Sequence, residues 1–194
     1  MKIFVMRHGQ EIETVRGGWS SVGLTEEGIV QVETTANSIV KNQRKFNIKK
    51  IISSDLQRAK QSAYIVADRL ELDVEFNSDF REINNGDFAD MKNEIADKLY
   101  PNLYYRTLEF DEHYPNGESP KEFYTRVKSA WLSLVETEFD GNILLVTHGG
   151  VINIIKSIID GKDYSNKEQY IKSICGGIAF LKEADPPILS KNIK

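Results

Sequence analysis

Two of the three histidines stand in the same sequence context, at the end of an apolar run and directly before a glycine. His8 follows the apolar run at residues 3–6, and His148 follows the run at residues 143–146. In an open α/β sheet, ligands bind at the carboxyl ends of the strands, where the loops leave the sheet. A glycine after each histidine permits a sharp turn and a close approach of a ligand to the backbone. We therefore expect both imidazoles to face one site at the same edge of a sheet.

Two arginines are expected at this edge as well. Arg7 directly precedes His8, and the helix predicted to begin after Ser54 places Arg58 in its first turn. A guanidinium group matches phosphate oxygens in pairs, the N-terminus of a helix attracts anions, and a neutral imidazole can attack phosphorus. A single strand-end histidine is more often an ordinary hydrogen-bonded group, and a single Arg58 is more often a surface charge. The combination of all four residues favours a phosphoryl site.

Short apolar runs alternate with longer amphipathic segments along the chain, which is typical of an α/β fold. Strands are predicted at residues 3–6, 51–52, 74–76, 143–146 and 178–181. Helices are predicted after the N-cap Thr25, after a capping box of Ser54 and Gln57, after Ser119 with Pro120 and Glu122, and from near Val151. The expected fold is a three-layer sandwich, with a mostly parallel sheet and helices on both of its faces.

One segment breaks this rhythm. Residues 84–116 are rich in tyrosine and contain a helix-like piece near residues 91–99. We expect a single domain over residues 1–194, in which residues 84–116 form a small insertion that lies over the C-terminal edge of the sheet and covers the substrate. The tyrosines are expected either to pack as a small satellite core or to form a wall that grips the leaving group. After Glu183 we expect an irregular surface segment.

The composition excludes several classes of protein. The 194 residues carry a formal net charge of −4, which argues against a protein that binds the phosphate backbone of nucleic acids. No run approaches the ~18 consecutive apolar residues of a membrane span, and Arg7 follows the first apolar run too early for a signal peptide. Cys175 is the single cysteine, which excludes an internal disulfide and a multi-cysteine zinc site. We expect a cytoplasmic protein that binds a small phosphorylated substrate, without nucleic acid, membrane, metal or cofactor.

An ordered series of motifs carries a resemblance to a known family. The motifs are Arg7-His8-Gly9, Gly18-Trp19 followed by residues 24–28, residues 53–59, residues 81–83 with 86–88, residues 115–119 and residues 146–150. Together they resemble the signature of the histidine phosphatase superfamily, the phosphoglycerate mutase-like enzymes. A bare Arg-His-Gly would be a weak signal, whereas the whole series in this order is specific.

The resemblance implies roles for individual residues. It implies that His8 is the nucleophile that becomes phosphohistidine, and that Arg7, Arg58 and His148 hold the phosphate oxygens. Glu82 would protonate the leaving oxygen and then activate water, unless it forms an ordinary surface ion pair with its neighbour Arg81. Further phosphate-binding positions implied by the motifs are Gln10, Thr14 and Gly149. The implied function is hydrolysis of small phosphate monoesters without a metal ion.

The sequence also departs from the family pattern. The asparagine that usually contacts phosphate is replaced by Thr14, and the usual serine or threonine two positions after Gly9 is replaced by Glu11. Glu11 and Glu13 place negative charge near an anion site, which would weaken phosphate binding or favour substrates with a cationic portion. Two alternatives to a phosphatase stay open, a mutase of the phosphoglycerate type and a phosphate-binding module without catalytic activity.

Overall fold

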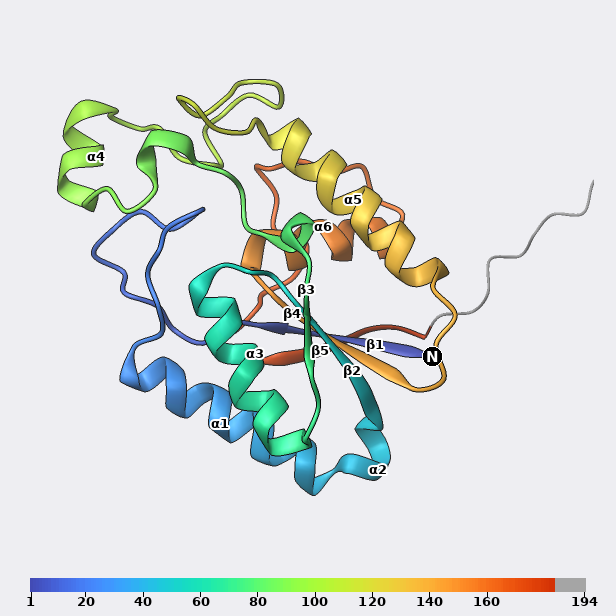
Figure 1. Cartoon of the computed structure of the whole chain (residues 1–194). Helices are drawn as coiled ribbons and strands as arrows, with labels where there is room; N and C mark the ends of the chain where they lie inside the picture. Colours follow the sequence, from blue (N-terminus) through green and yellow to red (C-terminus); the bar gives the residue numbers. More distant parts are fainter. Residues whose placement is uncertain (184–194) are drawn as a thin grey trace, which may run out of the picture.

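The computed structural model describes residues 1–183, and its core is a five-stranded sheet (Figure 1). The strands are β1 (Lys2–Arg7), β2 (Ile48–Ser53), β3 (Val74–Phe76), β4 (Asn142–Thr147) and β5 (Ile178–Glu183). Their order is β3-β2-β4-β1-β5, and all neighbours are parallel except β5, which is antiparallel to β1. The predicted α/β class with a mostly parallel sheet is confirmed.

Helices cover both faces of the sheet. The α-helices are α1 (Glu26–Lys41), α2 (Gln43–Phe46), α3 (Gln57–Leu70), α4 (Asn93–Leu99), α5 (Pro120–Glu136) and α6 (Gly149–Ile159). Figure 1 shows α1 and α3 on one side of the sheet and α5 and α6 on the other. Two short 3-10 helices, Ser78–Phe80 and Gly86–Phe88, lie between β3 and α4.

The alternation of side chains along each strand divides the core between these two faces. In β1, Phe4 and Met6 pack with α1 and α3, whereas Ile3 and Val5 pack with α5 and α6. All four side chains are buried, so β1 is apolar on both faces. Strands buried on both faces read as continuous apolar runs, which is why β1 and β4 could be predicted from the sequence.

The predicted helix starts are confirmed at two places. The Thr25 hydroxyl accepts a hydrogen bond from the Gly28 amide at 3.0 Å, and α1 begins at the next residue. At the start of α5, Ser119 and Glu122 form the predicted reciprocal capping box. Each cap satisfies amide groups that the first helical turn leaves without partners.

The capping box predicted for Ser54 and Gln57 is wrong. The N-cap of α3 is Leu56, which makes no side-chain cap hydrogen bond, and Gln57 is the first helical residue. The Ser54 hydroxyl instead contacts the ring of His148 at 2.8 Å and accepts from the Leu56 amide at 3.3 Å. Ser54 therefore contacts His148 at the carboxyl edge of the sheet and does not cap α3.

Residues 84–116 contain α4 and an aromatic cluster. The ring of Phe88 lies 4.7 Å from that of Tyr100 and 5.4 Å from that of Tyr114, between ring centroids. Tyr104, in contrast, is 41% exposed. Some tyrosines of this segment thus form the satellite core. That the chain is one domain with this segment covering a substrate stays a prediction, and the segment predicted after Glu183 lies outside the described residues.

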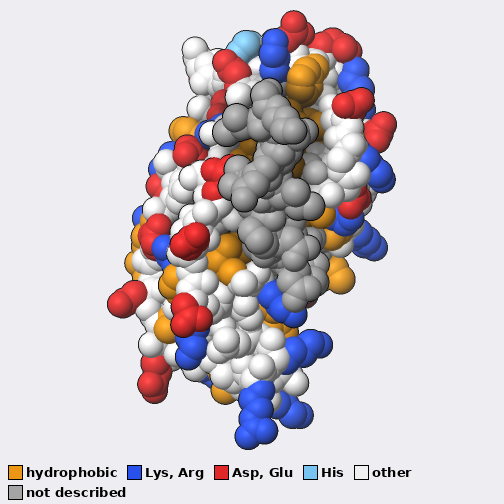
Figure 2. All heavy atoms as spheres, turned by 90° about the vertical axis from the view of Figure 1, so that its right-hand side faces the viewer, with side chains coloured by type: hydrophobic (Ala, Val, Ile, Leu, Met, Phe, Trp, Pro, Cys, Tyr) orange, Lys and Arg blue, Asp and Glu red, His pale blue; other side chains and the backbone are white. Residues whose placement is uncertain are grey.

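The end of the molecule from which β1 starts carries mixed charges. Figure 2 shows acidic and basic side chains interspersed over this face, with Lys and Arg gathered at its lower end, where α2 lies in Figure 1. In α2, Arg44 and Lys45 are exposed in the last turn. None of the helices within residues 1–183 has the length and apolar character needed to cross a membrane.

Candidate active site

The pairing of β1 with β4 brings the two strand-end histidines together. Arg7 is level with Thr147 in the parallel register, so the residues that follow each strand are neighbours. The rings of His8 and His148 lie 5.1 Å apart between centroids, and both side chains are buried. The His8 amide donates to the Thr147 carbonyl at 2.9 Å, which fixes the loop after β1 against the end of β4.

The His8 ring is held between the Gly9 carbonyl on one side and the Arg58 guanidinium on the other. Its Nδ1 atom lies 2.7 Å from the Gly9 carbonyl oxygen, which can only accept, so Nδ1 carries the proton. The Nε2 atom then holds the lone pair. Gly9 lies against α1, where a Cβ at this position would lie 2.3 Å from the Gly28 carbonyl oxygen. A larger residue after His8 would therefore displace the helix or the loop.

Arg58 stands in the first turn of α3 and is 1% exposed. Its guanidinium has three hydrogen-bond partners. Its Nε atom lies 3.4 Å from His8 Nε2. Its terminal nitrogens donate to the Ser20 hydroxyl at 3.2 Å and to the Gly18 carbonyl at 2.8 Å. A buried guanidinium held this way keeps its charge beside the Nε2 atom of His8, to which its Nε donates, without having to reorganise.

His148 is oriented by Ser54. The Ser54 hydroxyl oxygen accepts from the Leu56 amide, which leaves its proton free for His148 Nε2 at 2.8 Å. When the hydroxyl donates to Nε2, the single proton of the neutral ring is on Nδ1. Nδ1 is buried and has no hydrogen-bond partner among the described residues. The Nδ1–H group of His148 is therefore available to donate a hydrogen bond to a ligand.

Arg7 and the start of α6 complete the positive side of the site. Arg7 donates from one terminal nitrogen to the Ser173 carbonyl at 3.1 Å, while its buried Nε has no partner within residues 1–183. A Cβ on Gly149, the first residue of α6, would lie 3.6 Å from the Arg7 guanidinium carbon. The N-terminus of α6 therefore lies against the Arg7 guanidinium, and its partial positive charge adds to the charge of that arginine.

Glu82 faces this positive side and does not pair with its neighbour. Arg81 forms its ion pair with Asp55, so the alternative of an Arg81–Glu82 pair is wrong. The Glu82 carboxylate accepts from the Gly150 amide at 3.0 Å and from the Ile83 amide at 3.2 Å. A Cβ on Gly150 would lie 2.2 Å from Glu82 Oε1, so a glycine at this position makes room for the carboxylate.

Two side chains that the sequence analysis did not single out hold the backbone of Glu82. The Trp19 indole donates to the Glu82 carbonyl at 2.8 Å. Arg126, on α5, donates to the same carbonyl at 3.3 Å and is paired with both oxygens of Glu118 at 2.8 Å. Trp19 belongs to a recognised motif, but no sequence signal connects Arg126 to Glu82 because helix α5 has to pack before they meet.

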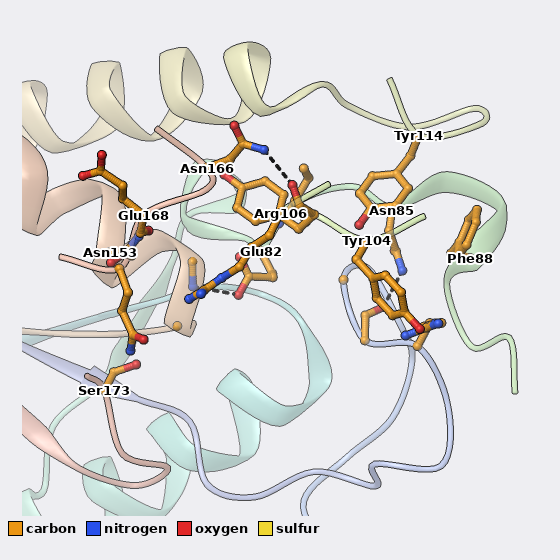
Figure 3. A pocket seen from close by; sticks show the side chains of 18 of the residues that line it. Glu82, Asn85, Phe88, Tyr104, Arg106, Tyr114, Asn153, Asn166, Glu168 and Ser173 are labelled. Carbon is orange, nitrogen blue, oxygen red and sulfur yellow. Dashed lines mark hydrogen bonds between the residues drawn. The ribbon is translucent and has the colours of Figure 1, made fainter. Parts of the chain in front are cut away.

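A cavity of about 410 Å³ opens beside these residues (Figure 3). Arg7, Glu82, Gly149 and Gly150 line one part of it. In Figure 3, Glu82 lies between a side with Asn153, Glu168 and Ser173 and a side with Tyr104, Tyr114 and Phe88. Its volume is within the range of small-molecule sites.

Not all of the predicted phosphate-binding residues lie in this group. Thr14 is exposed, and its carbonyl accepts from the Asn93 amide at 3.1 Å, so the structure does not place it with the histidines. The backbone of Gln10 bonds with Gln31 and Thr25, and its buried side-chain oxygen has no partner among the residues described. The path of the loop after Gly9 decides both positions, and no regular pattern in the sequence predicts that path.

The electrostatics keep both imidazoles neutral. Burial, followed by the positive charge of Arg58, lowers the pKa of His8 well below its ordinary value. Burial, then Arg58 and then His8, lowers the pKa of His148 in the same direction. A neutral His8 retains the lone pair that a nucleophile or base needs. The described residues contain no group of three His, Cys, Asp or Glu side chains arranged to hold a metal ion.

Comparisons with known proteins identify the family of the chain. The family model of the histidine phosphatase superfamily (branch 1) matches residues 3–176. Phosphoglycerate mutase-like protein 4 of Arabidopsis thaliana is 32% identical over 158 residues, which are 78% of this chain and 67% of that protein.

Solved structures show the same fold. The mycobacterial glucosyl-3-phosphoglycerate phosphatase is 27% identical, with a TM-score of 0.68 and coverage of 81% of this chain and 78% of that one. The alpha-ribazole phosphatase of Shigella flexneri has a TM-score of 0.70 at 24% identity, with coverage of 84% and 81%. The chain therefore belongs to the histidine phosphatase superfamily.

Proposed function

We propose that this protein is a phosphatase that hydrolyses small phosphate monoesters through a phosphohistidine on His8. The observation that carries the proposal is the orientation of the His8 ring. Nδ1 is bonded to the Gly9 carbonyl, and Nε2 is left as the acceptor next to the Nε atom of Arg58. A neutral imidazole with its lone pair next to a fixed positive charge is suited to attack a phosphoryl group.

In the first step, His8 Nε2 forms a bond to phosphorus and the bond between phosphorus and the ester oxygen breaks. Arg7, Arg58 and His148 hold the phosphoryl oxygens and stabilise the charge that develops on them. The ester oxygen leaves as an alcohol with a proton from Glu82, which lines the cavity together with Arg7. Glu82 becomes a carboxylate that the Gly150 amide stabilises.

In the second step, water attacks phosphorus and the bond to His8 Nε2 breaks. Glu82, now ionised, accepts the proton from this water, and inorganic phosphate leaves. The product atoms balance because the alcohol carries the proton that Glu82 lost and Glu82 regains one from water. General acid and base catalysis by one carboxyl in this way contributes about 10²–10⁴-fold to a rate.

A mutase is the second candidate function, because relatives at 32% identity carry the name phosphoglycerate mutase-like. A mutase has to keep the substrate bound while phosphate changes position, whereas a phosphatase has to admit water. Supply of 3-phosphoglycerate separates the two, since an isomeric phosphoglycerate indicates a mutase and free inorganic phosphate indicates a phosphatase.

Hydrolysis of p-nitrophenyl phosphate tests the proposal itself. The purified protein should release nitrophenol and phosphate in equal amounts. A protein that binds phosphate but releases no nitrophenol at any pH from 4 to 8 would be a binding module, and the proposal would be wrong. A screen of phosphorylated metabolites then identifies the preferred leaving group.

A further inference from the structure

The Glu11 carboxylate lies close to the positively charged residues of the site, Arg58 and Arg7. Its Oε2 atom is 3.0 Å from Arg58 Nε, the same nitrogen that faces His8 Nε2 at 3.4 Å. The side chain is 20% exposed, and Oε2 itself is buried. Its other oxygen, Oε1, would lie 3.4 Å from a Cβ on Gly17. The carboxylate therefore lies against the same guanidinium nitrogen that contacts His8 Nε2.

The contact with Arg58 is electrostatic rather than a directed hydrogen bond. Oε2 has no hydrogen-bond partner among the described residues, even though the guanidinium nitrogen is 3.0 Å away. A buried carboxylate oxygen without a donor has lost its hydration and gained only part of the compensation. The ionised form of this carboxylate is therefore poorly stabilised, and protonation lowers its free energy.

A phosphoryl group on His8 needs the same guanidinium. The distances place Arg58 Nε against both His8 Nε2 and Glu11 Oε2, so a phosphate oxygen drawn to Arg58 there meets the carboxylate. Two anions that share one buried cation repel each other.

The same loop contains a second glutamate that serves as a control. Glu13 is exposed, and its backbone carbonyl accepts from Asn93 Nδ2 at 2.7 Å.

We propose that Glu11 sets the affinity of the site for phosphate, because its ionised carboxylate competes with the phosphoryl group for Arg58 and takes up a proton when phosphate binds. The inference rests on the proposed function only in that phosphate is the ligand of this group of residues. It separates the two glutamates of the loop, since Glu11 acts on phosphate and Glu13 does not.

The charged groups around Glu11 favour this proton uptake. Arg58 on α3 and Arg7 on β1 act to keep Glu11 ionised, whereas Glu82 and Glu13 act in the opposite direction. Burial is the largest influence, and with the two glutamates it raises the pKa of Glu11 above its ordinary value. An incoming phosphate adds negative charge next to the carboxyl and moves the pKa further in the same direction.

Binding of inorganic phosphate, measured by titration calorimetry, tests the proposal without turnover. Glu11→Gln keeps the size of the side chain and removes the charge, and Glu13→Gln is the matched control. At pH 7.5, Glu11→Gln should bind phosphate at least about 10-fold more tightly than the wild type, which corresponds to about 1.4 kcal/mol. Glu13→Gln should bind as the wild type does.

The same titrations in buffers of different ionisation enthalpy count the protons taken up. The wild type and Glu13→Gln should take up more protons per phosphate than Glu11→Gln, and the ionisation of phosphate itself cancels in the comparison. Equal affinity, weaker binding by Glu11→Gln, or equal proton uptake would overturn the proposal. If Glu11→Gln does not fold, Glu11→Thr takes its place with the same expectations.

The outcome is independent of catalysis. A wild type that hydrolyses no p-nitrophenyl phosphate, while Glu11→Gln still binds phosphate more tightly, contradicts the proposed function and supports the role of Glu11. Failure of all variants to bind phosphate between pH 5 and 8 would overturn the role of Glu11.

Discussion

The Nε2 atom of His8 lies 3.4 Å from the Nε atom of Arg58, and both side chains are buried at the carboxyl edge of the sheet. The two residues come from different elements, since His8 follows β1 and Arg58 stands in the first turn of α3. Their contact depends on the parallel order of β1, β4 and β2, which brings three strand ends side by side.

Replacement of Arg58 by lysine should reduce kcat/KM by about 10²–10³-fold, because one fixed charge on the phosphoryl oxygens is worth that much. A lysine carries the charge, but it cannot contact His8, Ser20 and the Gly18 carbonyl at the same time as the guanidinium does. The measurement is steady-state hydrolysis of p-nitrophenyl phosphate. Activity within threefold of the wild type would show that the position of the charge is unimportant.

Replacement of Glu82 by glutamine should lower turnover by about 10²–10⁴-fold, because the amide can neither protonate the leaving oxygen nor activate water. With p-nitrophenyl phosphate, whose nitrophenolate leaves without a proton, phosphoenzyme should accumulate. Gln can still accept from the Gly150 amide through its oxygen, so the fold should tolerate the change. Quenched reactions with radiolabelled substrate, kept alkaline because phosphohistidine is labile to acid, measure the phosphoenzyme. Unchanged turnover would assign the proton transfers to another group.

Replacement of Gly150 by alanine should lower kcat by about 10–100-fold, since the new Cβ would lie 2.2 Å from Glu82 Oε1 and has to displace the carboxylate. The amide at position 150 is retained, so the effect isolates the position of Glu82 from the hydrogen bond. Steady-state kinetics combined with a melting curve distinguish displacement from unfolding. A folded variant with wild-type kcat would show that turnover does not depend on this position of the Glu82 carboxylate.

Stability should fall as the pH falls, because His8 and His148 are neutral and buried in the folded state. Their folded pKa values lie well below the ordinary value, so below about pH 6.5 the unfolded chain binds more protons than the folded one. The contribution of these groups is complete above that pH and is lost below it, at up to about 1.4 kcal/mol per pH unit for each histidine.

Urea unfolding of the wild type and of His8→Asn at pH 7 and pH 5 measures this dependence. The free energy of unfolding of the wild type should decrease more between the two pH values than that of the variant. An identical decrease in both proteins would mean that folding does not lower the pKa of His8, which contradicts the effect expected from its burial and from Arg58.

The sequence predicted the meeting of the histidines because the argument depends on strand ends alone. Continuous apolar runs identify β1 and β4, and the parallel pairing of these strands brings their carboxyl ends together. The burial of Arg58 could not be read from the sequence, since a charged residue in a first helical turn is ordinarily exposed. The path of residues 18–20 across its guanidinium, together with His8 and Glu11, provides the partners it needs there.

The loop after Gly9 shows where prediction from sequence ends. Glu11 and Thr14 are three residues apart, yet one lies against Arg58 and the other is exposed. The loop has no regular repeat that fixes which side chains turn inward; an isolated bridge between Glu11 and Leu24 and contacts with Lys92 and Asn93 decide this. The capping box predicted for Ser54 is wrong for a related reason, because its hydroxyl contacts His148, which is distant in sequence.

Identification of the phosphorylated residue tests the central claim most directly. A rapid quench of the Glu82→Gln variant with radiolabelled substrate, followed by digestion and mass spectrometry under alkaline conditions, should find one phosphoryl group on His8. The same experiment on the Glu82→Gln, His8→Ala double variant should find none, and His8→Ala should retain less than about 1% of wild-type activity. A phosphoryl group on another residue, or hydrolysis at an undiminished rate without His8, would contradict the account.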